Sequence, residues 1–319
     1  MEIHFTFQAI AAGMAKLFFL VLLGCAIYRL KLVDDKFIDK LTYLLVIILF
    51  PSLIISKTIT HFSFTQYAYW WVLPVSAVAF SLSGMALGAL VFKLFRGFGS
   101  RREFMCAVGF QNCGYLPMNL IIFSFSGLIA DRLLIYMFLF ISGFNLLMWS
   151  IAPLFLAGGL KRGFRWNVFL NPPVVAAVFS LLWVAVFGKG SMPELVMGPV
   201  RQLGQASFPV AMLTLGAYLC RYRAYVPENK APIISGVVLK LLVFPLFVFM
   251  LLLLVPVSGD YRFFLFLQST MPTAVSLIFI GSYTGADNRF FSSIIFYSHL
   301  IAVLSIPFWL GIFHLVFGT

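Results

Sequence analysis

The feature that most restricts the fold of this chain is a succession of ten apolar stretches, each near the length that crosses a bilayer. A helix needs roughly 20 apolar residues to cross the hydrocarbon core. Because hydrocarbon offers no partners to backbone N–H and C=O groups, only helices and closed barrels span it. We assign the stretches to about residues 8–28, 38–57, 67–93, 104–125, 133–158, 168–187, 195–219, 233–255, 263–284 and 291–316. The sequence therefore predicts an all-α polytopic membrane protein with ten transmembrane helices.

Composition excludes several other classes of protein. The chain is 62% hydrophobic and 10% charged, whereas an average globular domain is about 25% charged. Its net charge of +12 comes from basic residues in short loops, so we expect the lipid bilayer as a partner and no nucleic acid. We find no nucleophile paired with a base, no carboxylate pair and no glycine-rich phosphate loop, so no enzyme is predicted. The four cysteines fit neither a disulfide framework nor a zinc site.

The distribution of basic residues predicts the orientation. The loops after odd-numbered stretches carry 15 of them: Arg29, Lys31, Lys36, Lys40, Lys93, Arg96, Arg101, Arg102, Lys161, Arg162, Arg165, Arg221, Arg223, Lys230 and Arg289. The loops after even-numbered stretches carry 4: Lys57, Arg132, Lys189 and Arg262. Because positive residues stay cytoplasmic, we expect a multi-pass protein of the cytoplasmic membrane with both termini outside.

The fourth stretch, FMCAVGFQNCGYLPMNLIIFSF, is apolar at both ends and polar in its middle, where Gln111 and Asn112 precede Gly114, Tyr115 and Pro117. A proline removes a backbone donor and clashes with the carbonyl four residues earlier. A helix broken at membrane depth is tolerated only where it is buried in protein or lines a cavity. A plain proline kink satisfied by neighbouring helices is the alternative.

Prolines recur in the same order in the two halves of the chain. Pro51, Pro117 and Pro153 are followed by Pro209, Pro272 and Pro307 at offsets of 158, 155 and 154 residues. We therefore divide the chain into a first five-span repeat, 1–160, and a second, 161–319. Because each half holds an odd number of spans, the two repeats are inverted relative to each other. Inverted repeats with broken helices at matching places indicate a secondary transporter and its binding site.

The ninth stretch is the counterpart of the fourth, since Gln268, Ser269 and Thr270 precede its Pro272. Two broken helices that cross would present the N–H groups and positive dipole ends of their half-helices, which suit an anion. The opposite ends present carbonyls, which suit Na⁺.

Few ionisable residues lie in mid-span. We find no Asp or Glu there, which argues against a carboxylate proton relay. Lys240 either reaches the cytoplasmic surface or faces the cavity. His299 is either a hydrogen-bonded core residue or a titrating group, and the 154-residue offset aligns it with Asn145.

Several stretches resemble the auxin efflux carrier family, which includes bacterial malonate-type carriers. They are YRLKLVDDKFIDKLTYLLVIILFPSLII, QNCGYLPMNLI, LGQASFPVAMLTLGAYL, LKLLVFPLFVF and QSTMPTAVSLIFIGSYTGAD. Their order and spacing cover essentially the whole chain. The family's crossover residues match Asn112, Pro117 and Pro272. One departure from the family's pattern is the five-residue spacing from Asn112 to Pro117. Tyr115 stands in this gap and would shape the pocket.

The resemblance implies a scaffold of spans 1, 2, 6 and 7, which is often the dimer contact, so a homodimer through the scaffold spans is expected. It also implies a transport domain of spans 3–5 and 8–10 that moves like an elevator. The expected function is transport of a small organic anion, a carboxylate, bound at the span 4/span 9 crossover. The expected binding residues are Gln111, Asn112, Tyr115, Pro117, Asn145, Lys240, Gln268, Ser269, Thr270, Pro272 and His299.

Two questions stay open at this point. A membrane receptor with the same fold that binds a ligand without moving it is the alternative function. We expect no cofactor beyond a coupling ion, and uniport, Na⁺ symport through crossover carbonyls and H⁺ symport through His299 all fit the sequence.

Overall fold

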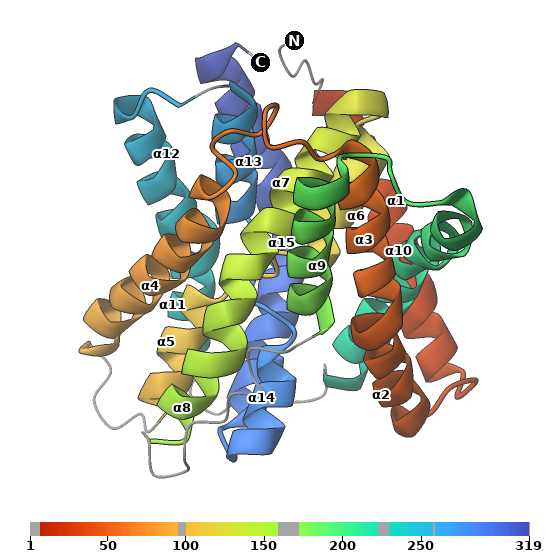
Figure 1. Ribbon diagram of the computed structural model, residues 1–319. Coiled ribbons are helices and arrows are strands. Elements are labelled where there is room, and N and C mark those ends of the chain that lie inside the picture. Colours follow the sequence, from red (N-terminus) through yellow and green to blue (C-terminus); the bar gives the residue numbers. More distant parts are fainter. Residues whose placement is uncertain (1–6, 95–99, 159–171, 223–229, 258, 319) are drawn as a thin grey trace.

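The computed structural model describes residues 7–94, 100–158, 172–222, 230–257 and 259–318, and helices are the regular structure in these ranges (Figure 1). The first half contains α1 (Phe7–Arg29), α2 (Asp35–Leu44), η1 (Leu45–Leu49), α3 (Phe50–His61), α4 (Val72–Phe92), α5 (Arg101–Gly109), α6 (Tyr115–Ser124), α7 (Gly127–Leu146), η2 (Leu147–Ile151) and α8 (Ala152–Leu156). The second half contains α9 (Pro172–Phe187), α10 (Glu194–Tyr222), α11 (Ala231–Val238), η4 (Leu239–Val243), α12 (Phe244–Leu254), α13 (Gly259–Ser269), α14 (Leu277–Thr284) and α15 (Asn288–Phe317).

The all-α class is confirmed, and in the described residues six helical stretches are long and apolar enough to cross a membrane. They are Asp35–His61, Val72–Phe92, Gly127–Leu156, Glu194–Arg221, Ala231–Leu254 and Asn288–Phe317. The other expected stretches correspond to α1, whose segment Phe18–Arg29 is a shorter apolar helix, to the shorter helix α9 and to two helices that are interrupted at their centres. Residues 168–171, where we expected the sixth stretch to begin, lie outside the described ranges.

Three of the long helices contain one widened π-helical turn, and a proline follows each turn. Pro51, Pro153 and Pro245 stand at the first or second position after η1, η2 and η4. A proline ring clashes with the carbonyl four residues back in an α-helix, whereas a π-helical turn moves that carbonyl one residue further away. The helices therefore continue through these prolines without ending.

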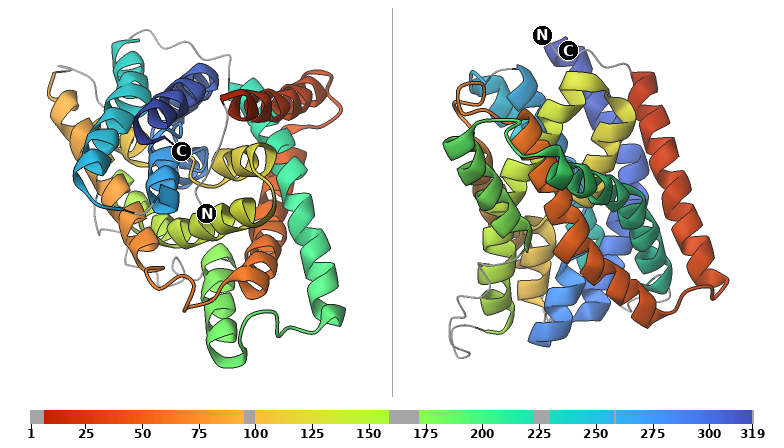
Figure 2. Two further views of the ribbon diagram at one scale, coloured as in Figure 1. Left: turned by 90° about the horizontal axis from the view of Figure 1, so that it is seen from above. Right: turned by 45° about the vertical axis from the view of Figure 1, so that its right-hand side comes forward.

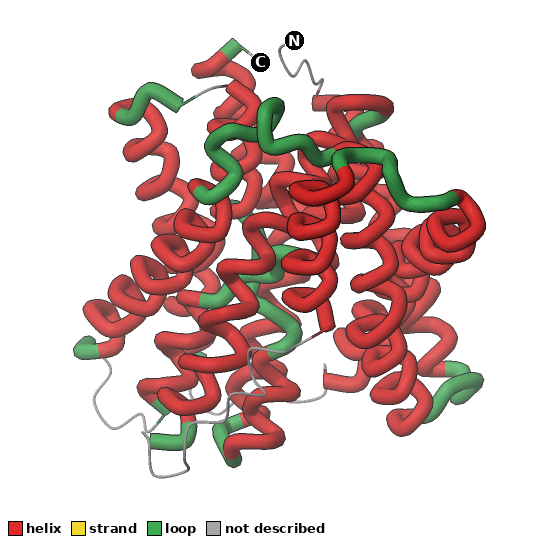
Figure 3. Tube along the Cα trace, in the orientation of Figure 1, coloured by secondary structure: helices red, strands yellow, loops and turns green. Residues whose placement is uncertain are grey.

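The two interrupted helices end completely and restart. In the first, α5 ends at Gly109 and α6 begins at Tyr115; in the second, α13 ends at Ser269 and α14 begins at Leu277. Pro117 lies in the first turn of α6, where a backbone N–H has no helical partner, so it starts a helix instead of kinking one. Figure 3 shows both loop segments inside the bundle at mid-height, between helices.

The helices form two groups on either side of the molecule (Figures 1 and 2). On one side, α1 packs along α10, and α3 packs on α9 and α10. On the other side, α4 packs on α5 and α7, and α11 packs on α15. The beginning of α1 and the end of α15 lie at the same end of the bundle (Figure 1).

The contact between α4 and α5 depends on two glycines, which allow the backbones to touch. A Cβ atom on Gly84 would lie 2.8 Å from the Cα of Gly109, and one on Gly109 would lie 2.8 Å from the Ser81 carbonyl oxygen. Because α5 leads directly into the first interruption, this close packing also fixes the position of residues 110–114.

We expect Gly84→Ala to lower the free energy of unfolding by about 1–3 kcal/mol, since the added methyl group meets backbone that cannot rotate away. Gly198→Ala is the matched control in α10, because its Cβ would meet no atom closer than 3.5 Å. A helical glycine with room for a methyl group gains stability on that change. Thermal unfolding in detergent measures both variants, and equal unfolding temperatures would contradict the close contact.

Candidate functional site

The two interruptions cross and pair with each other as short antiparallel segments. The Asn112 N–H donates to the Pro272 carbonyl at 2.7 Å, and the Ala274 N–H donates to the Phe110 carbonyl at 2.9 Å. Gln111 stands opposite Thr273 between these two bonds. The pairing satisfies backbone groups that neither helix could satisfy alone, and it joins the four half-helices into one unit.

Side chains cap the carbonyl ends of the first halves. Lys240 on η4 donates from Nζ to the Val108 carbonyl at 2.9 Å, and Thr273 donates from Oγ1 to the Ala107 carbonyl at 3.0 Å. At the end of α13, Ser269 and the following Thr270 donate their hydroxyls to carbonyls of that helix, at 2.6 Å and 2.8 Å. These four polar residues therefore supply hydrogen-bond donors to carbonyls at the ends of α5 and α13.

Helix α15 supports the crossing from behind through His299 and Ser298. His299 lies 2.9 Å from the Ile295 carbonyl through Nδ1 and 3.0 Å from Asn112 Nδ2 through Nε2. The carbonyl assigns the proton to Nδ1, so Nε2 accepts from the Asn112 amide. Ser298 Oγ lies 3.3 Å from the Thr273 N–H. His299 thereby fixes which way the Asn112 amide points.

A cavity of about 660 Å³ lies against the crossing. Its polar lining at the inner end comes from Gln111, Asn112 and Asn145, together with Gly114 and Ser276, the N-cap residues of α6 and α14. Apolar and aromatic side chains make up most of the rest, among them Phe50, Met118, Phe138, Phe144 and Trp149. The positive dipole ends of both second half-helices therefore border the cavity.

Gln111 is the most unusual side chain of this lining. It is fully buried, and neither its amide nitrogen nor its amide oxygen has a hydrogen-bond partner among the described residues. Gln268 donates to the Cys113 carbonyl at 3.3 Å, while its amide oxygen also has no described partner. An unsatisfied buried amide group costs about 1–3 kcal/mol, so Gln111 is suited to a ligand that enters the cavity.

The structure divides the residues expected at the site into two sets. Gln111, Asn112 and Asn145 line the cavity. The residues behind the lining, which are buried in helix contacts, are Pro117, Lys240, Gln268, Ser269, Thr270, Pro272 and His299. Tyr115 begins α6, but its side chain lies outside the described part of the structure. Sequence reasoning missed Thr273, although its place directly after Pro272 in the interrupted span was a usable signal.

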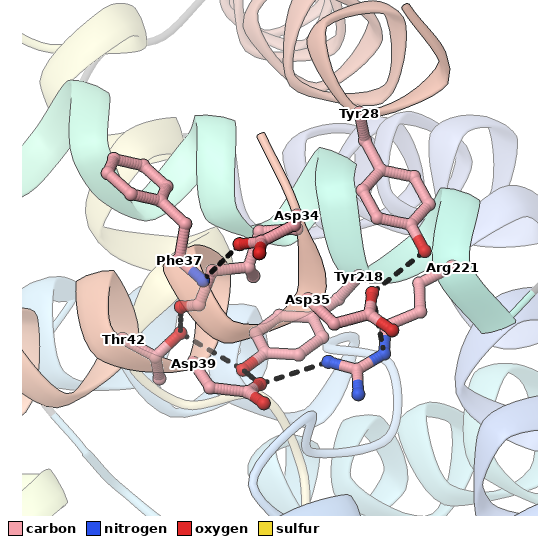
Figure 4. Close-up of polar contacts among 9 residues, drawn as sticks. Tyr28, Asp34, Asp35, Phe37, Asp39, Thr42, Tyr218 and Arg221 are labelled. Carbon is pink, nitrogen blue, oxygen red and sulfur yellow. Dashed lines mark hydrogen bonds and ion pairs between the residues drawn. The ribbon is translucent and has the colours of Figure 1, made fainter. Parts of the chain in front are cut away.

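The cavity extends from the crossing to a polar cluster at the end of the bundle where α1 ends and α2 begins (Figure 4). Arg221 pairs with Asp39 at 3.0 Å and with Asp35 at 3.3 Å. Tyr218 donates to Asp39 at 3.0 Å, and Tyr28 donates to Asp35 at 2.9 Å. These contacts hold α1, α2 and α10 together, and Asp39 and Arg221 themselves line the mouth of the cavity.

An ion pair links the two helix groups further along α3. Lys57 of α3 lies 2.6 Å from Asp131 of α7, and His61 lies 3.6 Å from the same carboxylate. Asp131 belongs to the first turns of α7, whereas Asn145, near the end of that helix, lines the cavity. The cavity and this ion pair therefore lie along different parts of the contact between α3 and α7.

The comparisons with known proteins give a family for this chain. The family model described as "Membrane transport protein" matches residues 9–162 and 159–310. The chain is 28% identical over 158 residues to Protein PIN-LIKES 2 of Arabidopsis thaliana, covering 45% of this chain and 35% of that protein. It is 24% identical over 143 residues to an uncharacterized transporter of Methanocaldococcus jannaschii, covering 43% of this chain and 44% of that protein.

The alignments thus span less than half of either relative's length. The family model covers nearly the whole chain, and the resemblance seen in the crossover motifs is confirmed. This chain is therefore a helical membrane protein that belongs to the membrane transport protein family of the auxin efflux carrier type.

Proposed function

We propose that this protein carries a small organic anion with a carboxylate group across the cytoplasmic membrane, and that the anion binds at the crossing of the two interrupted helices. The observation that carries the proposal is the buried amide of Gln111, which has no hydrogen-bond partner among the described residues and belongs to a residue that lines a cavity bordered by two helix N-termini. Buried polar groups in proteins are nearly always paired, so this amide is best explained as a group that pairs with substrate.

The electrostatics of the cavity favour a carboxylate. Each helix N-terminus carries roughly half a positive elementary charge, and α6 and α14 both begin at the cavity. The Gln111 amide has two N–H donors, and the Asn112 amide keeps one N–H after its bond to His299. These donors match the oxygens of a carboxylate. A volume of about 660 Å³ lies within the usual range of small-molecule sites.

The arrangement of helices supports alternating access by an elevator-like movement. In this proposal, ten spans form two inverted repeats, 1–160 and 161–319. Spans 1, 2, 6 and 7 are the scaffold and the dimer contact, and spans 3–5 and 8–10 are the moving domain. The grouping of α1, α3, α9 and α10 against α4, α5, α7, α11 and α15 is in keeping with that division. The cavity lies between the groups and extends toward the basic loops, so this state would face the cytoplasm.

A thermal-stability screen of the detergent-purified protein is the first test. We expect mono- or dicarboxylates to raise the unfolding temperature and their neutral amide analogues to leave it unchanged. A ligand at 100 times its dissociation constant adds about 2.7 kcal/mol to stability. Stabilisation by neutral or cationic compounds with none by anions would contradict the proposed site.

Flux measurements in proteoliposomes then separate transport from ligand binding alone. Uptake of the stabilising carboxylate, inhibited by an excess of the same unlabelled compound, is the expected result. Binding without any flux would contradict the transport function and favour a receptor with the same fold.

A further inference from the structure

Building on the proposed function, we infer that the Lys57–Asp131 ion pair is a latch between the two helix groups, which must break before the cavity opens at the end of the bundle opposite its present mouth. Lys57 lies on α3, in the group of α1, α3, α9 and α10. Asp131 lies on α7, in the group of α4, α5, α7, α11 and α15. In an elevator-like movement these groups shift against each other, so a contact between them holds in one position only.

Each partner of the ion pair is tied to its own group by a neighbour in the chain. Two residues after the lysine, the Ile59 carbonyl accepts from the Gly190 N–H at 2.7 Å, which joins the end of α3 to the segment between α9 and α10. Directly after the aspartate, Arg132 pairs with Asp260 in the first turn of α13, and α13 packs on α7 and α15. The two partners are therefore anchored separately, and neither follows the other when the groups move.

The ion pair lies at the end of the bundle away from the mouth of the cavity. Asp39 lines the mouth, and Lys57 follows it by 18 residues in the helical stretch Asp35–His61, which corresponds to about 27 Å along the helix axis. The cavity lining reaches Ile54 on α3 and Met137 on α7, and the ion pair lies beyond both residues. The latch is therefore on the side that has to open when the cavity changes sides.

Aromatic side chains pack at the same end of the bundle, on the segment that joins α3 to α4. Tyr67 stacks on Phe62 with the ring centres 5.3 Å apart, and it meets Tyr136 of α7 edge to face at 5.8 Å. All three rings are buried. Lys57 and Asp131 expose only 30% and 20% of their side chains. Because partly buried charges are screened less than exposed ones, this pair favours one position of the groups more strongly than a surface ion pair would.

Breaking the ion pair should shift the equilibrium between the two openings of the cavity. An interaction that exists in only one of two positions favours that position by its own free energy. We expect its loss to raise the population that opens at the opposite end about 10-fold relative to the described state, which corresponds to about 1.4 kcal/mol. A purely structural role would lower the unfolding temperature without changing this ratio.

The test uses Cys113, a free cysteine that lines the cavity, as a reporter of which end is open. The membrane-impermeant anion 2-sulfonatoethyl methanethiosulfonate is added to right-side-out and to inside-out membrane vesicles. Peptide mass spectrometry gives the rate of labelling at Cys113 alone from each face. We expect wild type to be labelled mainly from one face, and Lys57→Met and Asp131→Asn each to change the ratio of the two rates about 10-fold in favour of the other face.

Glu194→Gln is the matched control, because it breaks the 3.1 Å ion pair with Arg201 inside α10, and it should leave the labelling ratio unchanged. The charge-reversed pair, Lys57→Glu with Asp131→Lys, should restore the wild-type ratio. Single variants with an unchanged ratio, or a charge-reversed pair that restores nothing, would overturn the inference. Because labelling needs no substrate, a protein that moves no carboxylate but shows these shifts would contradict the proposed function and support the latch.

Discussion

Asn112→Ala is expected to abolish carboxylate uptake, by roughly 100-fold or more, while the protein still folds. Asn112 lines the cavity, and its amide is held in place by His299 at 3.0 Å. A hydrogen bond to a charged group is worth about 1.5–3 kcal/mol, and the upper value corresponds to roughly 100-fold in rate. Initial uptake in proteoliposomes and thermal unfolding in detergent measure the two effects.

The matched control is Asn119→Ala. Asn119 is a fully buried asparagine of α6, in the same interrupted span, and it is not among the cavity-lining residues. Loss of the Asn119 side chain should lower the free energy of unfolding and leave carboxylate uptake by the folded protein intact. If Asn112→Ala took up carboxylate at the wild-type rate, or if both variants lost uptake equally, Asn112 would have no specific role in binding substrate.

Gln111→Met is expected to stabilise the protein and, at the same time, to lower carboxylate uptake. The two side chains are similar in length, but methionine has no amide to leave unsatisfied. Because both polar atoms of Gln111 are buried without a described partner, the change should raise the free energy of unfolding by about 1–3 kcal/mol. The same change removes a donor to the carboxylate, so uptake should fall by roughly 10-fold or more.

Gln202→Met is the control for this variant, since Gln202 is an exposed residue of α10. It should change neither the unfolding temperature nor uptake. A lower unfolding temperature for Gln111→Met would mean that the glutamine stabilises the fold through partners of its own. A stabilised variant with full uptake would mean that substrate does not use this amide.

The helical class and the places of the two interruptions could be predicted from the sequence because both follow from local chemistry. Long apolar stretches must be helical in lipid, and polar residues next to glycine or proline in mid-span favour an interruption there. The interruptions at 110–114 and 270–276 therefore fall inside the expected stretches 104–125 and 263–284. The π-helical turns before Pro51, Pro153 and Pro245 were not predicted, since a proline signals a disturbance without specifying its form.

The sequence by itself thus determined that the chain is helical and interrupted at two polar points, one of which carries the asparagine and glutamine of the site. Only the tertiary structure decided which of the amide residues line the cavity. Gln111 lines it, whereas Gln268 is directed to the Cys113 carbonyl, and Lys240 reaches the Val108 carbonyl instead of the cavity. These partners lie more than 130 residues apart in the chain. The rotation of each helix about its axis, set by packing against its neighbours, determines which of them meet.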